Sequence, residues 1–327
     1  MHKGKNIAVV VPCYNEEKNI AAVLDTMPGF VDKIIAVDDN SRDNTAGILK
    51  VYSQNMPSKF INIRHEKNMG VGSAIVTGYK WCLENGIDVA AVMAGDNQMN
   101  PAELGRIVES VVEDRTDYCK GNRFTSGKAW RMVSPVRYMG SAVLTLFTKF
   151  VSGYWHVSDS QSGFTAVSID ALRKIDVAGI YPGYGMPNDM LVKLNVAECR
   201  VQDMPIEPIY HKQSASKMRL GRVMFSIPCL LFRLFFWRMK EKYFIRDFHP
   251  LVFFYAAAAA LLPAALMLGA NVIRRNTPLF GPVEAPLQMG WIILCSLFFI
   301  SGFQFLLFAM WFDMDYNRHL YIFKEKR

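Results

Sequence analysis

Acidic and aromatic side chains occur directly after three short apolar segments of this sequence. Tyr14 and Glu16 follow the run IAVVVP, Asp39 ends the run KIIAVDD, and Asp96 follows VAAVMA. An aromatic ring beside carboxylates can bind a nucleoside, because the ring stacks on the base and the carboxylates accept hydrogen bonds from ribose hydroxyls. An Asp-Asp pair is also typical of a turn or a helix cap, so both interpretations stay open here.

The segment Gly95-Asp96-Asn97-Gln98 places a carboxylate two positions before an amide. Oxygen ligands of this kind suit a hard divalent cation such as Mg2+ or Mn2+, which would keep waters and take diphosphate oxygens as further ligands. Taken as a bare pattern, Gly-Asp-Asn is more often a simple turn.

Five cations form a third group, namely Arg123 after a strand, then Arg131 and Arg137, and later Lys217 and Arg219. Cations so placed could neutralise a departing diphosphate. For any one of them, solvated surface charge is the commoner explanation.

The elements that would position these residues alternate in type. Apolar runs at 7–12, 33–39, 61–65 and 89–94 predict strands, and the segments 44–54, 71–84 and 101–113 predict helices, with a further helix capped by Asn15. Strands alternating with helices predict an α/β fold with a Rossmann-like, mostly parallel sheet and helices on both faces. Ligands bind beyond the carboxyl ends of such strands, which is where the polar residues lie.

The C-terminal part of the chain has a different character. Residues 136–155 predict an apolar helix that belongs to the core or touches a membrane, and residues 211–246 mix cations with aromatics as interfacial amphipathic helices do. The stretches 250–270 and 289–312 each reach the roughly 20 apolar residues that span a bilayer. Basic residues flank the pair on both sides and predict that both termini are cytoplasmic, although Arg274 and Arg275 in the connection weaken that signal.

The overall composition excludes several classes of protein. The net charge of +8 could suit nucleic acid, but the basic cluster directly precedes membrane spans and contains no nucleic-acid docking motif. The six cysteines are scattered, so neither a zinc site nor a disulfide framework is predicted. No secretory signal is visible at the start of the chain.

Seven stretches occur in a specific order and spacing over about the first 220 residues: VVPCYNEEKNI, VDDNSRDNT, NMGVGSAIVTGY, AGDNQMNPAEL, KGNRF, DSQSGFTA and NDMLVKLNVAECRVQDMPI. Together they resemble the family 2 inverting glycosyltransferases of the GT-A fold. Within that family the sequence is most similar to dolichol-phosphate mannose synthase and the bacterial polyprenyl-phosphate glycosyltransferases.

The resemblance implies a role for each matching residue. Pro12, Tyr14 and Glu16 would line the nucleotide pocket, and Asp39 would contact base or ribose. Asp96 and Gln98 would hold the metal and the donor diphosphate, and Arg123 would lie near the donor or acceptor phosphates. Three further groups complete the implied site: Ser162-Gly163-Phe164 at the sugar and acceptor pocket, Asn188-Asp189 where relatives carry an acidic pair, and Lys217 with Arg219 on a loop that closes over the donor.

The sequence departs from the family pattern at two places. The metal motif usually reads Asp-x-Asp, and here Ala94 stands at its first position, so coordination would depend on Gln98 and water. The acidic pair is reduced to Asn188-Asp189, which leaves a single candidate carboxylate. We expect Asp189 to orient groups when the acceptor is a phosphate, and to act as a base when it is a sugar hydroxyl.

The resemblance and the apolar spans together predict a membrane-anchored enzyme that uses a UDP- or GDP-sugar donor and a polyprenyl-phosphate lipid acceptor, undecaprenyl or dolichyl. Two alternatives remain: a transferase acting on a glycolipid or surface-polysaccharide hydroxyl, and a non-catalytic scaffold that binds nucleotide-sugar. The expected domain limits are 1–210 for the catalytic domain, 211–248 for the basic loop and interfacial helices, and 249–327 for the hairpin and tail. A homo-oligomer is left open.

Overall fold

The computed structural model describes residues 1–124, 135–207, 220–276 and 289–323. The chain divides into two compact units, of which the first comprises Met1–Arg238 with His319–Arg327 and the second comprises Met239–Arg318. The domain limits expected from the sequence, after residues 210 and 248, stay a prediction.

The first unit is built on one sheet, which has eight strands within the described residues, in the order β3-β2-β1-β4-β6-β5-β7-β8. Strand β6 runs antiparallel to its neighbours β4 and β5, and the remaining pairs are parallel. The mostly parallel sheet predicted from the sequence is therefore confirmed. The strands are β1 (Ile7–Cys13), β2 (Lys33–Asp38), β3 (Phe60–Arg64), β4 (Val89–Val92), β5 (Tyr118–Asn122), β6 (Thr165–Ser168), β7 (Val201–Pro205) and β8 (Tyr321–Ile322).

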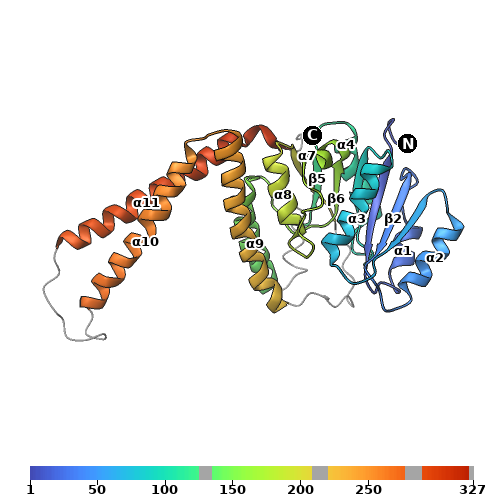
Figure 1. Ribbon diagram of the computed structural model, residues 1–327, viewed down its shortest axis with the longest axis horizontal. Coiled ribbons are helices and arrows are strands. Elements are labelled where there is room, and N and C mark those ends of the chain that lie inside the picture. Colours follow the sequence, from blue (N-terminus) through green and yellow to red (C-terminus); the bar gives the residue numbers. More distant parts are fainter. Residues whose placement is uncertain (125–134, 208–219, 277–288, 324–327) are drawn as a thin grey trace. The chain divides into compact units, whose positions relative to one another are not determined.

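Helices cover both faces of this sheet, because the central strands are apolar on both sides (Figure 1). Along β1, Ala8 and Val10 pack under α3 (Val71–Glu84), α7 (Ile169–Lys174) and α8 (Met186–Val196), whereas Val9 and Val11 pack under the opposite layer. That layer consists of α1 (Ile20–Asp25), α2 (Thr45–Asn55) and α4 (Leu104–Val112), the last preceded by a 3-10 turn at Pro101–Glu103. Continuous apolar runs such as IAVVVP thus signalled strands buried on both faces.

The structure corrects one expectation about the first helix. Helix α1 begins at Ile20 with Asn19 as its cap residue, so Asn15 does not cap it. Asn15 instead adopts a left-handed conformation with φ of 55°, which asparagine tolerates better than most residues. The loop after β1 is consequently longer than expected, and its side chains are available for contacts with neighbouring loops.

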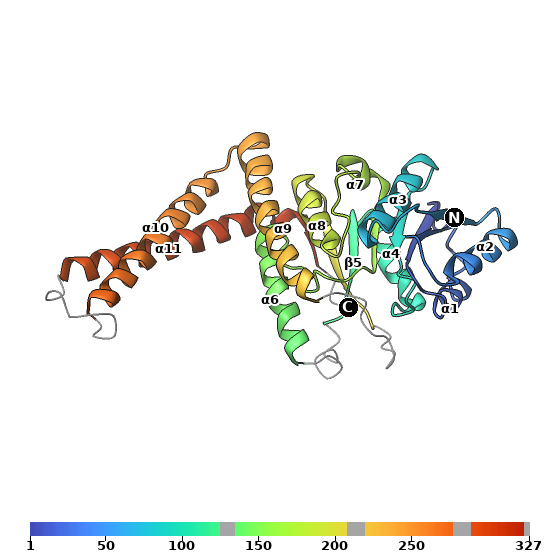
Figure 2. The same cartoon turned by 60° about the horizontal axis from the view of Figure 1, so that its bottom comes forward.

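Two long helices lie side by side at one end of the sheet in this unit, as both views show (Figures 1 and 2). Helix α6 (Pro135–Ser152) packs on α8 and on α9 (Leu220–Lys240) through a small apolar cluster that includes Val151, Val192 and Leu231. The remaining surface of α6 exposes Met139, Val143, Leu146 and Phe147. The helix predicted at 136–155 is confirmed, and it is only partly a core helix.

The C-terminal segment returns to the sheet of the first unit. After a short 3-10 turn (Arg318–Leu320), strand β8 pairs in parallel with β7, and Leu320 is buried in the core cluster beneath α8. The segment that follows the hairpin in the chain therefore contributes a strand and a core side chain to the first unit.

The second unit is a hairpin of two apolar helices, α10 (Leu251–Asn276) and α11 (Met289–Tyr316). In the most apolar 18-residue stretch of each helix, only 17% (α10) and 11% (α11) is buried, whereas the core helix of a soluble protein is mostly buried. The two helices contact each other through small residues: Ala258, Ala265 and Ala309 are buried, and a Cβ on Gly302 would lie 3.0 Å from Leu262. Small residues at a helix contact let the backbones approach closely, as membrane helices require.

Polar side chains gather where this hairpin begins and ends. A π-helical turn (Glu241–Arg246) precedes α10, and its Tyr243 donates a hydrogen bond to the carboxylate of Asp313 near the end of α11. Lys242 donates to the side-chain oxygen of Asn317 at 2.8 Å. These buried groups satisfy one another and join the two ends of the hairpin.

Candidate active site

The polar residues that follow β1 and β2 are joined by hydrogen bonds at the carboxyl edge of the sheet. The backbone N–H of Asn15 donates to the hydroxyl of Ser41 at 2.9 Å, and the backbone N–H of Glu16 donates to the hydroxyl of Thr45 at 2.8 Å. In return, the side-chain oxygen of Asn15 accepts from the backbone N–H of Arg42 at 2.8 Å. The loop that carries Tyr14 and Glu16 is therefore bonded to the loop that follows Asp39.

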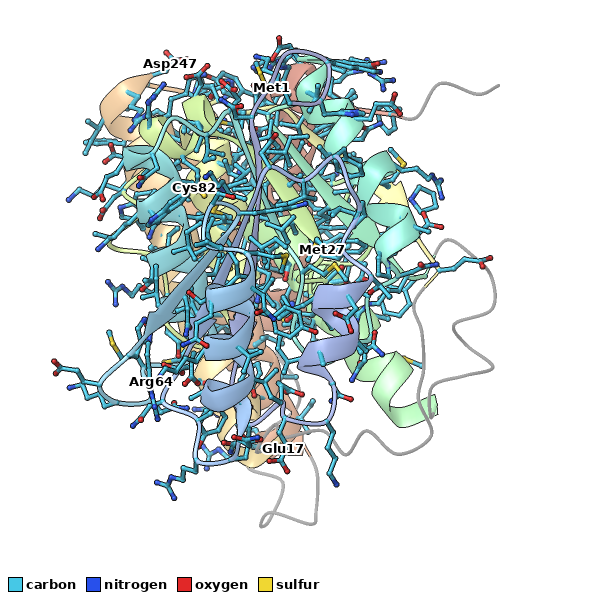
Figure 3. The ribbon with its side chains drawn as sticks, turned by 90° about the vertical axis from the view of Figure 1, so that its right-hand side faces the viewer. Met1, Glu17, Met27, Arg64, Cys82 and Asp247 are labelled. Carbon is cyan, nitrogen blue, oxygen red and sulfur yellow. The ribbon has the colours of Figure 1, made fainter. Side chains whose placement is uncertain are left out.

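Figure 3 shows the same edge from the side, with Glu17 after β1 and Arg64 at the end of β3 at one end of the sheet and Met1 at the other. Arg64 lies 3.3 Å from the buried carboxylate of Asp38, which also accepts a hydrogen bond from the backbone N–H of Ser41. The loops after three neighbouring strands therefore converge, because parallel strands end at a common edge.

Asp39 is 3% exposed and its carboxylate is engaged by the segment that leads into α3. It accepts hydrogen bonds of 2.8 Å from the backbone N–H groups of Met69 and Gly70, and His65 Nδ1 lies 2.8 Å from it. The other ring nitrogen of His65 lies 2.9 Å from the Thr77 hydroxyl. Asp39 thus anchors residues 65–70, while its expected contact with base or ribose stays a prediction.

Sequence reasoning missed His65, which was the last residue of an expected strand. The sequence contained one signal for it, namely its position at the end of the predicted strand and shortly before the glycines that open α3.

The loop after β4 packs against the end of β1. The backbone N–H of Gly95 donates to the carbonyl oxygen of Pro12 at 3.3 Å, and a Cβ at Gly95 would lie 3.3 Å from Cys13 Sγ. Asp96 and Gln98 are half-buried, and one carboxylate oxygen of Asp96 accepts from the backbone N–H of Gln98 at 3.1 Å. The predicted pair of metal ligands therefore lies beside the loop that carries Tyr14.

Across the described part of the chain, no group of three histidine, cysteine, aspartate or glutamate side chains is placed to hold a metal ion. With Ala94 in place of a second carboxylate, Asp96 and Gln98 are two ligand side chains, of which one is charged. Mg2+ is commonly held by one or two carboxylates together with substrate phosphates, so these residues fit a cation that arrives with a diphosphate. They do not fit a site made by protein ligands alone.

Arg123 follows β5 and forms a two-point contact with Asp159, a residue that sequence reasoning had not singled out. Its Nε lies 2.7 Å and its Nη2 3.0 Å from the two carboxylate oxygens, and its backbone N–H donates to the same group at 3.1 Å. Burial of Asp159 raises its pKa, but the hydrogen bonds and charge of Arg123 and the charge of Lys120 outweigh burial and hold that pKa below its usual range. Asp159 therefore carries its charge at neutral pH.

The segment that contains Asp159 meets the loop of Asp96. A Cβ at Gly163 would lie 3.6 Å from the Met99 methyl group, and the carbonyl oxygen of Phe164 accepts from the backbone N–H of Gly121 at 2.8 Å. Ser162 and Phe164 are buried, Phe164 within the core cluster under α4. Of the three residues predicted to shape the sugar and acceptor pocket, only Gly163 is partly exposed.

Asp189 lies within the first turn of α8 and is 4% exposed. Its carboxylate accepts a hydrogen bond of 2.7 Å from the backbone N–H of Tyr181 and lies 3.0 Å from the ammonium of Lys193. Asn188 accepts from the side chains of Thr148 and Gln161, at 2.9 Å each. Both residues therefore hold other parts of the protein in place, and Lys217 and Arg219 lie outside the described residues.

Residues 8–176 match the glycosyl transferase family 2. Over 225 residues, which are 65% of this chain and 89% of the relative, the sequence is 31% identical to a UDP-N-acetylglucosamine–dolichyl-phosphate N-acetylglucosaminyltransferase of Methanococcus voltae. It is 30% identical to an undecaprenyl-phosphate mannosyltransferase of Micrococcus luteus, over 66% of this chain and 89% of the relative.

Among solved structures, glucosyl-3-phosphoglycerate synthase from Mycobacterium tuberculosis is similar with a TM-score of 0.52 and 17% identity, over 71% of this chain and 80% of that one. A likeness at this identity concerns the fold alone, and it agrees with the sheet and helix layers described above. The converging strand-end loops, the order of the motifs and the match over more than half of the sequence lead to one conclusion: the chain belongs to glycosyltransferase family 2.

Proposed function

We propose that this protein transfers a sugar from a UDP- or GDP-sugar to a polyprenyl phosphate at a membrane surface. One combination of observations carries the proposal: polar loops after β1, β2 and β4 converge at one edge of the sheet, and the same chain continues into a hairpin of two exposed apolar helices. The M. voltae and M. luteus relatives, whose names specify dolichyl phosphate and undecaprenyl phosphate, support the choice of acceptor.

The acceptor chemistry agrees with the arrangement of Asp189. A lipid monophosphate has its second pKa near 6, so it is largely dianionic at neutral pH and attacks the anomeric carbon without a general base. The displacement is in line, inverts the anomeric centre and releases a nucleoside diphosphate. Because Asp189 is bound by Tyr181 and Lys193, it acts in this proposal as an orienting residue. A sugar-hydroxyl acceptor would require a base, and the surroundings of Asp189 do not favour that role.

A divalent cation would be held by Asp96 and Gln98 together with the donor diphosphate, and would supply charge neutralisation at the leaving group. Tyr14 and Glu16 would bind the nucleoside beside it, and Arg123 would act on phosphate oxygens. These roles follow from the family pattern and from the convergence of the loops that carry these residues.

Membrane attachment follows from the hairpin. The apolar helix Leu251–Arg275 has 25 residues and is therefore about 38 Å long, which exceeds the roughly 30 Å thickness of the hydrocarbon core of a bilayer. The chain leaves the first unit at Arg238 and re-enters it at His319, so two spans would leave both flanks on the same side as the sheet. Nucleotide-sugars are cytosolic substrates in this proposal, which places that side and both termini in the cytoplasm. The exposed apolar residues of α6 are consistent with a surface close to lipid.

The test is transfer of radiolabelled sugar from a panel of UDP- and GDP-sugars to undecaprenyl or dolichyl phosphate, with purified protein in detergent and Mg2+ or Mn2+. A labelled lipid product that mild acid hydrolyses is the expected result. Asp96→Ala should abolish transfer, whereas Asp170→Ala, which removes an exposed carboxylate on α7, should not. Nucleotide binding without transfer to any polyprenyl phosphate would exclude the proposed acceptor.

A further inference from the structure

Two arginine–aspartate pairs at opposite ends of β5 share one hydrogen-bond pattern. At the carboxyl end, Arg123 binds Asp159 through its backbone N–H, Nε and Nη2, at 3.1, 2.7 and 3.0 Å. At the amino end, Arg200 binds Asp117 through the same three groups, at 2.6, 3.1 and 3.2 Å. The Asp117 side chain is 20% exposed, whereas the Asp159 side chain is 1% exposed. Of the two pairs, only the one at the carboxyl edge of the sheet has a fully buried aspartate.

Asp159 is itself held by a buried lysine. Lys120, on β5, is 0% exposed, and its ammonium donates hydrogen bonds to the carbonyl oxygens of Asp159 and, at 3.1 Å, Ser162. Burial lowers the pKa of Lys120 to about 8, although the charges of Asp159 and Asp203 act in the opposite direction. A buried ammonium costs free energy unless it is well bonded, and these two carbonyls fasten the segment 159–162 to the strand.

A third contact fastens the other end of that segment. The carboxylate of Asp203, on β7, accepts from the backbone N–H of Ser158 at 2.9 Å and from the side chain of Asn122. The side-chain oxygen of Asn122 accepts from the backbone N–H of Phe124 at 2.8 Å. The residues on both sides of Arg123 are therefore tied to the strands, and so is the segment that presents Asp159.

We propose that Asp159 and Lys120 are positioning residues, which hold the guanidinium of Arg123 in one orientation towards the phosphate groups of the reaction. The inference rests on the proposed function, because it assigns the target of Arg123. A guanidinium has five N–H donors, and its two-point contact with a carboxylate involves two of them. Fixing the side chain beforehand removes the ordering cost from the binding step.

The position of this network favours a role in the reaction over a purely structural one. It lies at the carboxyl edge, and its segment reaches Met99 in the loop of Asp96 through Gly163. A small displacement of a group that contacts the reacting phosphates can cost on the order of 100-fold in rate. The pair of Asp117 and Arg200 makes the same hydrogen bonds, but it lies at the amino end of the strand, at the opposite edge of the sheet from the loop of Asp96.

The two pairs provide a matched experiment on the full-length protein in detergent. Asp159→Asn and Asp117→Asn each remove one negative charge from an equivalent hydrogen-bond pattern, and both are compared with wild type for thermal stability, kcat and KM of transfer. We expect Asp159→Asn to lower kcat/KM on the order of 100-fold, with a change in Tm similar to that of Asp117→Asn. Lys120→Met should also lower kcat/KM.

A double-mutant cycle separates positioning from general damage. Arg123→Lys keeps the positive charge beside Asp159 but loses the planar guanidinium that makes the two-point contact. This variant therefore tests the same interaction from the side of Arg123, even if Asp159→Asn folds poorly. Once Arg123 is lysine, Asp159→Asn should cost much less than in wild type, because interacting residues are not additive. Equal activity losses in Asp159→Asn and Asp117→Asn, or full additivity with Arg123→Lys, would overturn the inference. Absence of transfer by wild type with every donor would instead remove the proposed function, and the inference with it.

Discussion

The phenol of Tyr321 donates a hydrogen bond of 2.7 Å to the carbonyl oxygen of Gly153, which lies 168 positions earlier in the chain. The ring of Tyr321 also lies 4.5 Å from the ring of His156, and the neighbouring Leu320 is buried in the core. The last described residues thus close the edge of the sheet after the chain has passed through the hairpin.

Deletion of residues 319–327 should therefore destabilise the first unit. Burial of one leucine side chain is worth about 1.5–3 kcal/mol, and strand β8 and the Tyr321 hydrogen bond are lost with it. We expect a fall in the Tm of the detergent-solubilised protein, measured by differential scanning fluorimetry. Deletion of residues 324–327 alone is the control and should leave Tm unchanged. Equal Tm values for the two deletions would show that the returning segment adds no stability.

His156 should make the protein sensitive to acid. Burial lowers its pKa to about 4, although its hydrogen bond to the carbonyl oxygen of Val201 acts in the opposite direction. The unfolded chain binds a proton near pH 6.5, so the neutral ring stabilises the folded state above that pH, and this stability is lost as pH falls from 6.5 towards 4.

His156→Gln removes the titrating group and should flatten this part of the pH dependence. The free energy of unfolding of wild type, relative to the variant, should fall by up to about 1.4 kcal/mol per pH unit across the window. Chemical unfolding at pH 7, 6, 5 and 4 measures this difference. Parallel curves for the two proteins would mean that His156 does not titrate as its burial indicates.

Gly72 should not tolerate a side chain. A Cβ at this position would lie 2.2 Å from the carbonyl oxygen of Tyr181, and the backbone N–H of Gly72 donates to the carbonyl oxygen of Pro182 at 2.8 Å. Gly72→Ala must displace the loop that also binds Asp189, and overpacking of this kind costs about 1–3 kcal/mol. We expect lower Tm and lower kcat together. Gly29→Ala is the control, because no atom lies within 4 Å of its added Cβ.

Ala94→Asp should raise the affinity of the protein for the divalent cation. It restores the second carboxylate of the family pattern beside Asp96, and affinity for divalent cations rises with the number of charged ligands. The concentration of Mn2+ that gives half-maximal transfer should fall several-fold. Ala102→Asp adds the same charge at an exposed position of the 3-10 turn and should leave that concentration unchanged. An unchanged requirement in Ala94→Asp would argue against a cation at Asp96.

Asp189→Asn should lower stability without changing the shape of the pH–rate profile. The substitution breaks the 3.0 Å ion pair with Lys193, but a phosphate acceptor needs no base. Asp176→Asn, in the loop that precedes α8, is a control, because its carboxylate accepts only the exposed hydrogen bond from the backbone N–H of Gly179 among the contacts described. Loss of the acid limb of kcat/KM in Asp189→Asn, at normal Tm, would instead identify Asp189 as a base.

The fold class could be predicted from the sequence because its signals are local. A continuous apolar run such as Ile7–Pro12 has few explanations other than a strand covered on both faces, and strands that alternate with helices mostly pair in parallel. Strands β5 and β6 are the exception, since α6 lies between them and they pair antiparallel. The two long apolar helices could also be predicted, since each stretch contains about 20 consecutive apolar residues, the length needed to span a bilayer. The start of α1 was harder, because Asn15 is a good cap and also a residue that tolerates positive φ.

Residue types and spacing alone determined that this chain is an α/β protein followed by an apolar hairpin, with carboxylates at the strand ends. The tertiary structure decided which partner each charged group has. Arg123 with Asp159 and Asp39 with His65 are contacts between segments that lie 36 and 26 positions apart in the sequence. Such pairings depend on sheet order and on where each loop crosses, and local propensity carries no information about either. Lys120 and Asp159 lie in the matching stretches KGNRF and DSQSGFTA, but only the tertiary structure shows that they contact each other and Arg123.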